Sequence, residues 1–151
     1  MDYDSALDTM KHKDRVAHFL LFCARELIKR AMVHDRSKLM EPEKAIFDEF
    51  TPKLKASTYG SEEYKDFLKE MGAGLKVHYE ANRHHPEHFP DGIGGMHLID
   101  VLEMFCDWRA ATERHADGDI HRSIEQNAVR FHLSKQLASI LTNTATLMDL
   151  P

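Results

Sequence analysis

The sequence has no long run of apolar residues. No stretch of its 151 residues approaches the roughly 20 apolar positions that a membrane-spanning helix requires. The acidic start MDYDSALD has neither the positive charge nor the apolar segment of a secretory signal peptide. We therefore expect no membrane association and a cytoplasmic location.

Positive charge is also scarce. The chain has 20 Lys and Arg against 25 Asp and Glu, a net charge of −5, and no run rich in Lys or Arg. Because binding to a polynucleotide depends on a basic surface that neutralises backbone phosphates, we expect no polynucleotide partner. A small anionic ligand can still bind where a few positive side chains gather.

Cysteine is nearly absent. The only two cysteines, Cys23 and Cys106, lie in apolar surroundings and do not form a CxxC motif. This usage excludes a disulfide framework and a zinc ribbon. We expect both to be reduced core residues of a cytosolic protein.

Strand patterns are missing as well. No segment rich in Val and Ile alternates with polar residues, whereas apolar residues recur at intervals of three and four along most of the chain. A chain of this length is most simply one domain. We predict an all-α fold, a single helical domain over residues 1–151 with about five to seven helices. The expected helices cover 4–34, a segment beginning near Pro42, 61–85, 97–115, and one or two within 120–148.

Glycine and proline are few, and they mark the expected breaks. Pro86 should end the helix of residues 61–85, and Gly72 or Gly74 should kink or break it in the middle. Residues 51–60 read as a connecting segment, and the Pro/Gly-rich stretch 86–95 reads as a loop.

Histidine, by contrast, is plentiful. The chain has 11, and the stretch NRHHPEHFPDG at 82–92 crowds His84, His85, Glu87 and His88 into five positions. A metal site would explain this concentration, and so would a polar surface loop. His78 and His85 are seven residues apart, so they would share one face of a continuous helix.

A second cluster is HDRSK at residues 34–38. Adjacent residues such as His34 and Asp35 point to different sides of a helix, so they can approach one ion only where the backbone turns. Residues 35–41 have the character of a helix end. An imidazole nitrogen together with a carboxylate oxygen suits a divalent transition metal.

These residues together resemble a known family. The order His12, His34-Asp35, Asp107 resembles the HD-domain superfamily of metal-dependent enzymes, and HDRSK is similar to its HDxxK form. HHPEHFPDGIGG is similar to the HHExxDGxGYP motif of the HD-GYP branch, but its spacing differs by a residue or two and it lacks the Tyr-Pro. The whole pattern over residues 9–115 looks closer still to a small uncharacterised bacterial and phage family allied to HD domains.

The resemblance implies an HD-like helical bundle and a metal site. One ion would be bound by His12, His34, Asp35 and Asp107; His18 remains an alternative to His12, and Asp100 to Asp107. In dinuclear branches further histidines bind a second ion with Asp35 as the bridge, which makes His78, His84 and His85 candidates. The cofactor would be one or two divalent ions of Mn, Fe, Co, Ni or Zn.

A geometric condition comes with this ligand set. His12 and His34 are 22 residues apart with no Gly or Pro between them. A straight helix would separate them by about 33 Å, too far for a shared ion. The set therefore requires a turn, which we place near Cys23–Glu26.

The predicted function is a metal-dependent phosphohydrolase acting on a nucleotide or other small phosphate ester through a metal-activated water. Lys38 and Asp35 would be catalytic, and the substrate would be bound by Arg36, Asn82, Arg83 and Arg109. One alternative is a di-iron oxygenase on the same fold, and another is a non-catalytic metal-binding accessory protein. A homo-oligomer is compatible with the sequence, which does not specify the oligomeric state.

Overall fold

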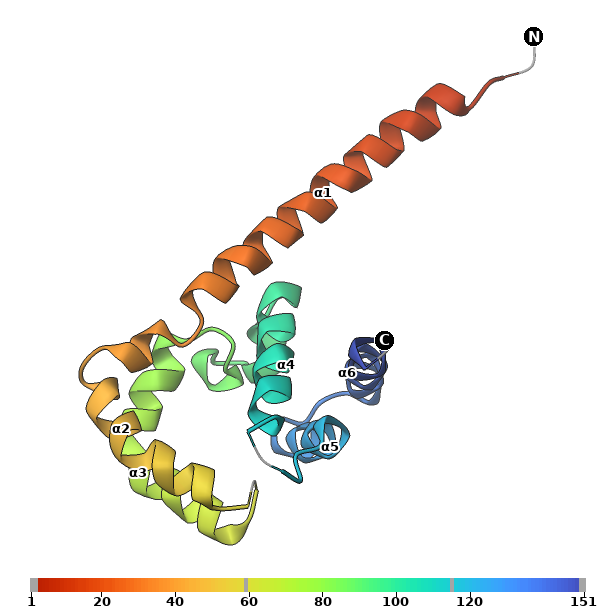
Figure 1. Cartoon of the computed structure of the whole chain (residues 1–151). Coiled ribbons are helices and arrows are strands. Elements are labelled where there is room, and N and C mark those ends of the chain that lie inside the picture. Colours follow the sequence, from red (N-terminus) through yellow and green to blue (C-terminus); the bar gives the residue numbers. More distant parts are fainter. Residues whose placement is uncertain (1–2, 59, 115, 150–151) are drawn as a thin grey trace. The chain divides into compact units, whose positions relative to one another are not determined.

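The computed structural model describes residues 3–58, 60–114 and 116–149. Within these ranges it contains six α-helices, three short 3-10 helices and no strand, so the prediction of an all-α fold is confirmed (Figure 1). No helix in the same ranges is long and apolar enough to cross a membrane. The chain divides between His34 and Asp35 into two units, which are described separately below. The single domain over residues 1–151 stays a prediction.

The first unit is one helix, α1 (Ala6–Val33), with His34 as its C-cap. The turn predicted near Cys23–Glu26 is wrong, because α1 continues through that segment. No residue there breaks the helix, since Gly and Pro are missing from the whole stretch. None of the residues of α1 is buried. Cys23 is exposed, so its prediction as a core residue is also wrong.

The second unit begins with the short 3-10 helix η1 (Arg36–Leu39), followed by α2 (Glu43–Ala56) and α3 (Glu62–Ala81). Ser61 is the N-cap of α3, as its position before Glu62 and Glu63 predicts, and Pro42 is the N-cap of α2, one residue before the first turn in which the sequence predicts it. The prediction of a connecting segment over 51–60 is wrong in its first half, since α2 continues to Ala56 with Pro52 inside it. The helix-favouring residues of KLKA after Pro52 outweigh the hydrogen bond that its missing N–H removes.

Two glycines shape the contact between α2 and α3. Gly72 adopts φ 40° and ψ −108°, so α3 is kinked where the sequence predicts a weak point. A Cβ at Gly74 would lie 2.2 Å from Cδ1 of Ile46, so only glycine allows α2 and α3 to approach this closely. His78 follows Gly74 by one turn, which places it on the same close-packed face.

The end of α3 differs from the prediction. The helix ends at Ala81 with Asn82 as its C-cap, four residues before the predicted end at His85. The chain then passes through two 3-10 helices, η2 (Pro86–His88) and η3 (Gly92–Gly95).

The remaining helices are α4 (Leu98–Thr112), α5 (Ile120–Arg130) and α6 (Lys135–Met148), and they share the main apolar core. α4 begins with a capping box between His97 and Asp100, and His115, at its predicted end, lies outside the described residues. The core prediction is wrong for Cys106, whose place on α4 is exposed. The buried core residues are Met104, Phe105, Trp108, Ile120, Ile124, Leu141 and Ala145.

Candidate metal centre

Four side chains of the second unit converge on one point. Asp35, His78, His84 and His85 each offer a ligand atom, and these atoms all lie within 4.8 Å of one another. Oδ1 of Asp35 is 3.4 Å from Nε2 of His78 and 3.4 Å from Nε2 of His84. Nε2 of His78 is 2.9 Å from Nε2 of His85. We call these four residues the His/Asp cluster.

The backbone explains why neighbouring residues can converge. Asp35 lies in the left-handed region at φ 53°, where Asp is tolerated better than most residues. His78 is in the last turn of α3, whereas His84 and His85 follow the end of that helix. Consecutive residues diverge on a helix, but the rings of His84 and His85 are only 4.1 Å apart between centroids.

The spacing fits a metal ion. Imidazole nitrogens and carboxylate oxygens bind transition metals at about 2.0–2.2 Å, so two ligands of a tetrahedral ion lie roughly 3.4 Å apart. Both distances from Oδ1 of Asp35 have this value. The shorter distance between His78 and His85 corresponds to a hydrogen bond, which an ion would replace. Three nitrogens and one oxygen suit Mn, Fe, Co, Ni or Zn.

A buried carboxylate orients one of these imidazoles. Nδ1 of His78 lies 2.8 Å from Oε2 of Glu43, a residue only 3% exposed. The Ser37 hydroxyl donates to the same oxygen at 2.9 Å, and the Asn82 amide donates to Ser37 Oγ at 2.8 Å. Because an ionised carboxylate only accepts hydrogen bonds, the contact with Glu43 favours the tautomer in which His78 donates from Nδ1 and turns the lone pair of Nε2 toward the cluster.

Glu43 and Ser37 were not predicted as site residues. A signal for Glu43 was available, because it lies three and seven residues before Ile46 and Phe50 and so shares the apolar face of α2. A carboxylate on such a face requires a specific partner. Nothing comparable in the sequence marks Ser37.

Two acidic residues of α4 face the other side of the cluster. Oε1 of Glu103 lies 3.4 Å from Nδ1 of His84, and both side chains are nearly buried. One turn later, the negative charge of Asp107 acts on His85 and favours its protonated form. Asp107 is therefore near His85, and it also offers a ligand atom within 4.8 Å of one of Asp35, as the predicted ligand set requires.

Burial keeps the imidazoles of His78 and His85 neutral. Burial lowers the pKa of His85 to about 2, helped by the neighbouring His84 and His78 and opposed by Asp107 and Asp35. The pKa of His78 is also lowered, first by burial and then by the charge of Lys38, against the effect of Glu43 and Asp35. Neutral rings have free lone pairs, which metal binding requires.

Lys38 lies on the second oxygen of the shared carboxylate. Its Nζ is 2.5 Å from Oδ2 of Asp35, and it lies 4.6 Å from the centre of the Phe47 ring. The two side chains are partly exposed, at 27% for Lys38 and 17% for Asp35. A ligand arriving from solvent can therefore meet the ammonium group beside the cluster.

The predicted ligand His12 does not join this site. α1 is continuous, so about 33 Å of helix separates His12 from His34, and the two cannot bind one ion within one chain. The predicted ligand set requires a turn between His12 and His34, and α1 has no such turn, so His12 cannot bind the same ion as His34. His34 is the last residue of the first unit, and its role as a ligand stays a prediction.

The predicted substrate-binding residues have varied surroundings. Arg83 donates two hydrogen bonds to the buried carboxylate of Asp100, at 3.2 and 3.0 Å. Arg109 binds Asp149 at 2.7 Å. Asn82 donates a hydrogen bond to Ser37, which in turn contacts Glu43 beside the cluster. Arg36, the neighbour of Asp35 in the chain, is exposed. Of the positive side chains proposed for phosphate, Lys38 is the one in direct contact with the cluster.

Comparison with known proteins identifies a family whose function is unknown. The model of a family of unknown function, DUF5662, matches residues 1–147, so the chain belongs to that family. No curated protein and no solved structure is significantly similar to the chain.

Proposed function

We propose that this member of DUF5662 is a metal-dependent phosphohydrolase acting on a small phosphate ester, such as a nucleotide. The observation that supports this best is the convergence of Asp35, His78, His84 and His85, with Lys38 on the outer oxygen of Asp35. A divalent ion bound there would lower the pKa of a bound water and supply hydroxide for attack on phosphorus.

The protein's own residues have separate tasks in this proposal. His78, His84 and His85 bind the ion as neutral imidazoles, and Asp35 adds the one negative ligand. Glu43, through its contact with His78, fixes which nitrogen faces the ion. Lys38 attracts a phosphate oxygen on the more exposed side of the cluster. We propose one ion at this cluster, because its four ligand atoms surround a single point.

The same four ligands also support a second candidate function. A tetrahedral ion with four protein ligands is closed, as in structural zinc sites, whereas a catalytic ion keeps a position open for water. A six-coordinate ion such as Mn or Fe would have two open positions here. The alternative is therefore a non-catalytic protein in which a tetrahedral zinc ion stabilises the second unit.

Metal analysis and a substrate panel separate the two candidates. Protein purified without a histidine tag would be analysed for bound metal, then stripped and reloaded with Mn²⁺, Co²⁺ or Zn²⁺ before assay on nucleotides and simple phosphate esters. Turnover that depends on the added ion and is lost in Asp35→Asn would support the hydrolase. Tightly bound zinc without turnover on any substrate would support the structural ion.

A further inference from the structure

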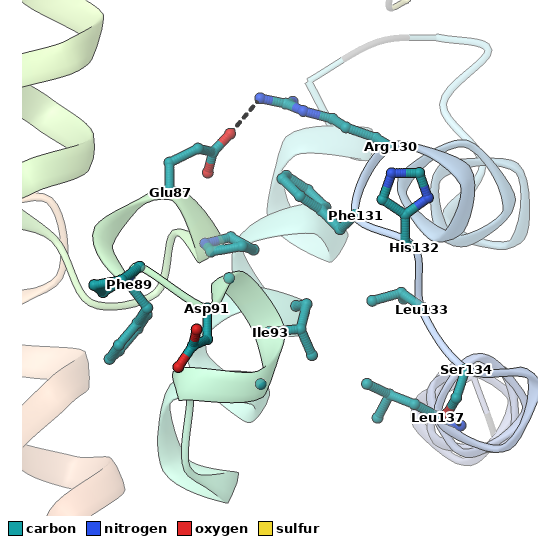
Figure 2. A pocket seen from close by; sticks show the side chains of 14 residues that line it. Glu87, Phe89, Asp91, Ile93, Arg130, Phe131, His132, Leu133, Ser134 and Leu137 are labelled. Carbon is teal, nitrogen blue, oxygen red and sulfur yellow. Dashed lines mark hydrogen bonds and ion pairs between the residues drawn. The ribbon is translucent and has the colours of Figure 1, made fainter.

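A cavity of about 610 Å³ lies immediately after the His/Asp cluster in the chain (Figure 2). Its first lining residue is Pro86, the neighbour of His85, and its two walls are the segment 86–94 and the segment 130–137 from the end of α5 into α6. The volume is within the range of about 300–1,000 Å³ typical of small-molecule sites.

The cavity is lined mainly by apolar side chains, with Asp91, His132 and Ser134 among them, and it has a charged end. Ile93 lies on one wall, and Phe131, Leu133 and Leu137 lie on the other (Figure 2). At one end Arg130 donates to Glu87 at 2.7 Å, which joins the two walls. Sugar hydroxyls placed against such side chains would lose hydrogen bonds to water, whereas an aryl or branched alkyl group would bury apolar surface.

A chain of contacts connects the cavity with the cluster. The same Arg130 nitrogen that binds Glu87 lies 3.4 Å from the Tyr79 hydroxyl. The Tyr79 ring in turn lies against the ring of His85, with centroids 4.7 Å apart. The cavity is thus linked to the candidate metal centre through the side chains of Arg130 and Tyr79.

The backbone of the cavity wall is strained. In the described part of the chain two residues other than glycine have positive φ, and these are Asp35 in the cluster and His132 in the cavity wall, at φ 52°. A residue in this conformation just after a helix is usually glycine.

We propose that the cavity is the subsite for the organic group of the phosphate ester, and that this group is apolar, either aryl or branched alkyl. The assignment of the ligand as a phosphate ester rests on the proposed function. The preference of the cavity for an apolar group does not. The substrate class would be an aryl or alkyl phosphate in preference to a sugar phosphate or inorganic phosphate.

Binding can be tested without turnover. Trp108, the only tryptophan of the chain, is stacked on Phe131 with centroids 6.1 Å apart, so its fluorescence should report occupation of the cavity. Benzyl alcohol should produce a saturable change and glycerol none. In NMR spectra of the metal-free protein, the shifts caused by benzyl alcohol should be confined to residues 86–94 and 130–137 and to Trp108, which is stacked on Phe131. Shifts elsewhere or no saturation would overturn the proposal.

A variant in which an added side chain fills part of the cavity tests the same binding. A Cβ at Gly94 would meet only Cβ of Asp91 at 3.8 Å, an ordinary contact, so Gly94→Leu can occupy space in the cavity without a backbone clash. Gly94→Ala is the control for the loss of glycine. Gly94→Leu should abolish the benzyl alcohol signal, and Gly94→Ala should retain most of it. Equal signals from both variants would place the probe outside this cavity.

The substrate preference is the second measurement. In the metal-loaded protein, kcat/KM for phenyl phosphate should exceed that for glycerol 2-phosphate by at least about tenfold, the scale of a well-filled apolar subsite. Gly94→Leu should reduce this ratio toward one. A ratio near one in the unmodified protein would overturn the subsite. If neither ester is hydrolysed but benzyl alcohol still binds in the cavity, the proposed function fails and the apolar selectivity stands.

Discussion

Lys38 and Asp35 form a close charged contact at the candidate metal centre, with Nζ 2.5 Å from Oδ2. The other oxygen of the same carboxylate is 3.4 Å from both His78 and His84. Asp35 thus has two functions in one side chain, since one oxygen is directed at the imidazoles and the other at the ammonium group. The two residues are separated by a single turn of η1, so this division is set by local backbone geometry.

The first prediction concerns Asp35→Asn. Asn tolerates the left-handed backbone of this position, so the fold should be retained, but the negative ligand is lost. Because loss of an outer partner of a ligand already costs about 10–100-fold in metal affinity, loss of the ligand itself should cost more than that. Calorimetric titration of the metal-free protein with Zn²⁺ or Mn²⁺ measures the change. The control is Asp66→Asn, an exposed acid paired with Lys69 on α3. Equal metal affinity in the two variants would remove Asp35 from the site.

The second prediction concerns Lys38→Met. Its positive charge opposes a cation at Asp35, so metal affinity should stay the same or increase, while turnover of a phosphate ester should fall at least about tenfold through the loss of a charged contact to phosphate. The unfolding free energy should change by less than roughly 1 kcal/mol, because the side chain is partly exposed. Steady-state kinetics and urea denaturation test both parts. Lys44→Met, which removes an exposed ion pair with Asp48, is the matched control. Unchanged turnover in Lys38→Met would indicate a purely structural lysine.

The third prediction concerns the buried carboxylate of Glu43. Glu43→Gln keeps the size of the side chain and weakens its hydrogen bond with Nδ1 of His78, so metal affinity should fall by about 10–100-fold. In the metal-free protein, ¹⁵N NMR of the imidazoles should show His78 protonated at Nδ1 in the unmodified chain and a mixture of tautomers in the variant. Glu49→Gln, on the exposed part of the same helix, should change neither quantity. A pure Nδ1–H tautomer in the variant would show that Glu43 does not orient the ring.

Sequence reasoning predicted the helical class and most helix starts because these depend on local signals, such as the cap at Ser61 and the proline before α2. It placed the end of α3 too late, since Asn82 can end a helix without a proline or glycine beside it. That error matters for the site. His78 and His85 were expected to share a helix face, whereas they meet because the chain leaves the helix between them.

The residues that contact the cluster are harder to predict from the sequence. Glu43 lies 35 residues before His78 in the chain, and the two meet only because α2 packs closely on α3 at Gly74. Arg83 was expected to bind substrate because of its charge, but a buried aspartate 17 residues later binds it in the structure. Both contacts depend on tertiary packing, which local spacing does not specify.

The fourth prediction is a pH dependence of stability in the metal-free protein. Burial lowers the pKa of His78 and brings that of His85 to about 2, below the value near 6.5 that these residues have in the unfolded chain. As the pH falls below about 6.5, the unfolded chain takes up protons that the folded protein does not. The free energy of unfolding should therefore decrease with falling pH, by up to about 1.4 kcal/mol per pH unit for each histidine.

The variant His85→Asn isolates this effect from other titrating groups. Urea denaturation at about pH 7 and about pH 5.5 should show a smaller loss of stability in the variant than in the unmodified protein, by up to the contribution of one histidine. The difference should persist when saturating metal is present, because a bound ion also keeps His85 deprotonated in the folded state and adds its own pH dependence. Identical pH profiles of the two metal-free proteins would mean that His85 titrates normally in the fold.

The last prediction is the stoichiometry of the ion. Asp35, His78, His84 and His85 surround one point, so the chain should bind one ion tightly at neutral pH, and His84→Ala/His85→Ala should lose it. The two substitutions leave only His78 and Asp35, too few ligands for a stable tetrahedral site. Elemental analysis after dialysis gives the number of ions per chain. His121→Ala/His132→Ala removes two histidines from α5 and the turn after it, and should still bind one ion. Two ions per unmodified chain, with one remaining in His84→Ala/His85→Ala, would show that a second metal position exists outside the cluster and that the single-ion assignment is wrong.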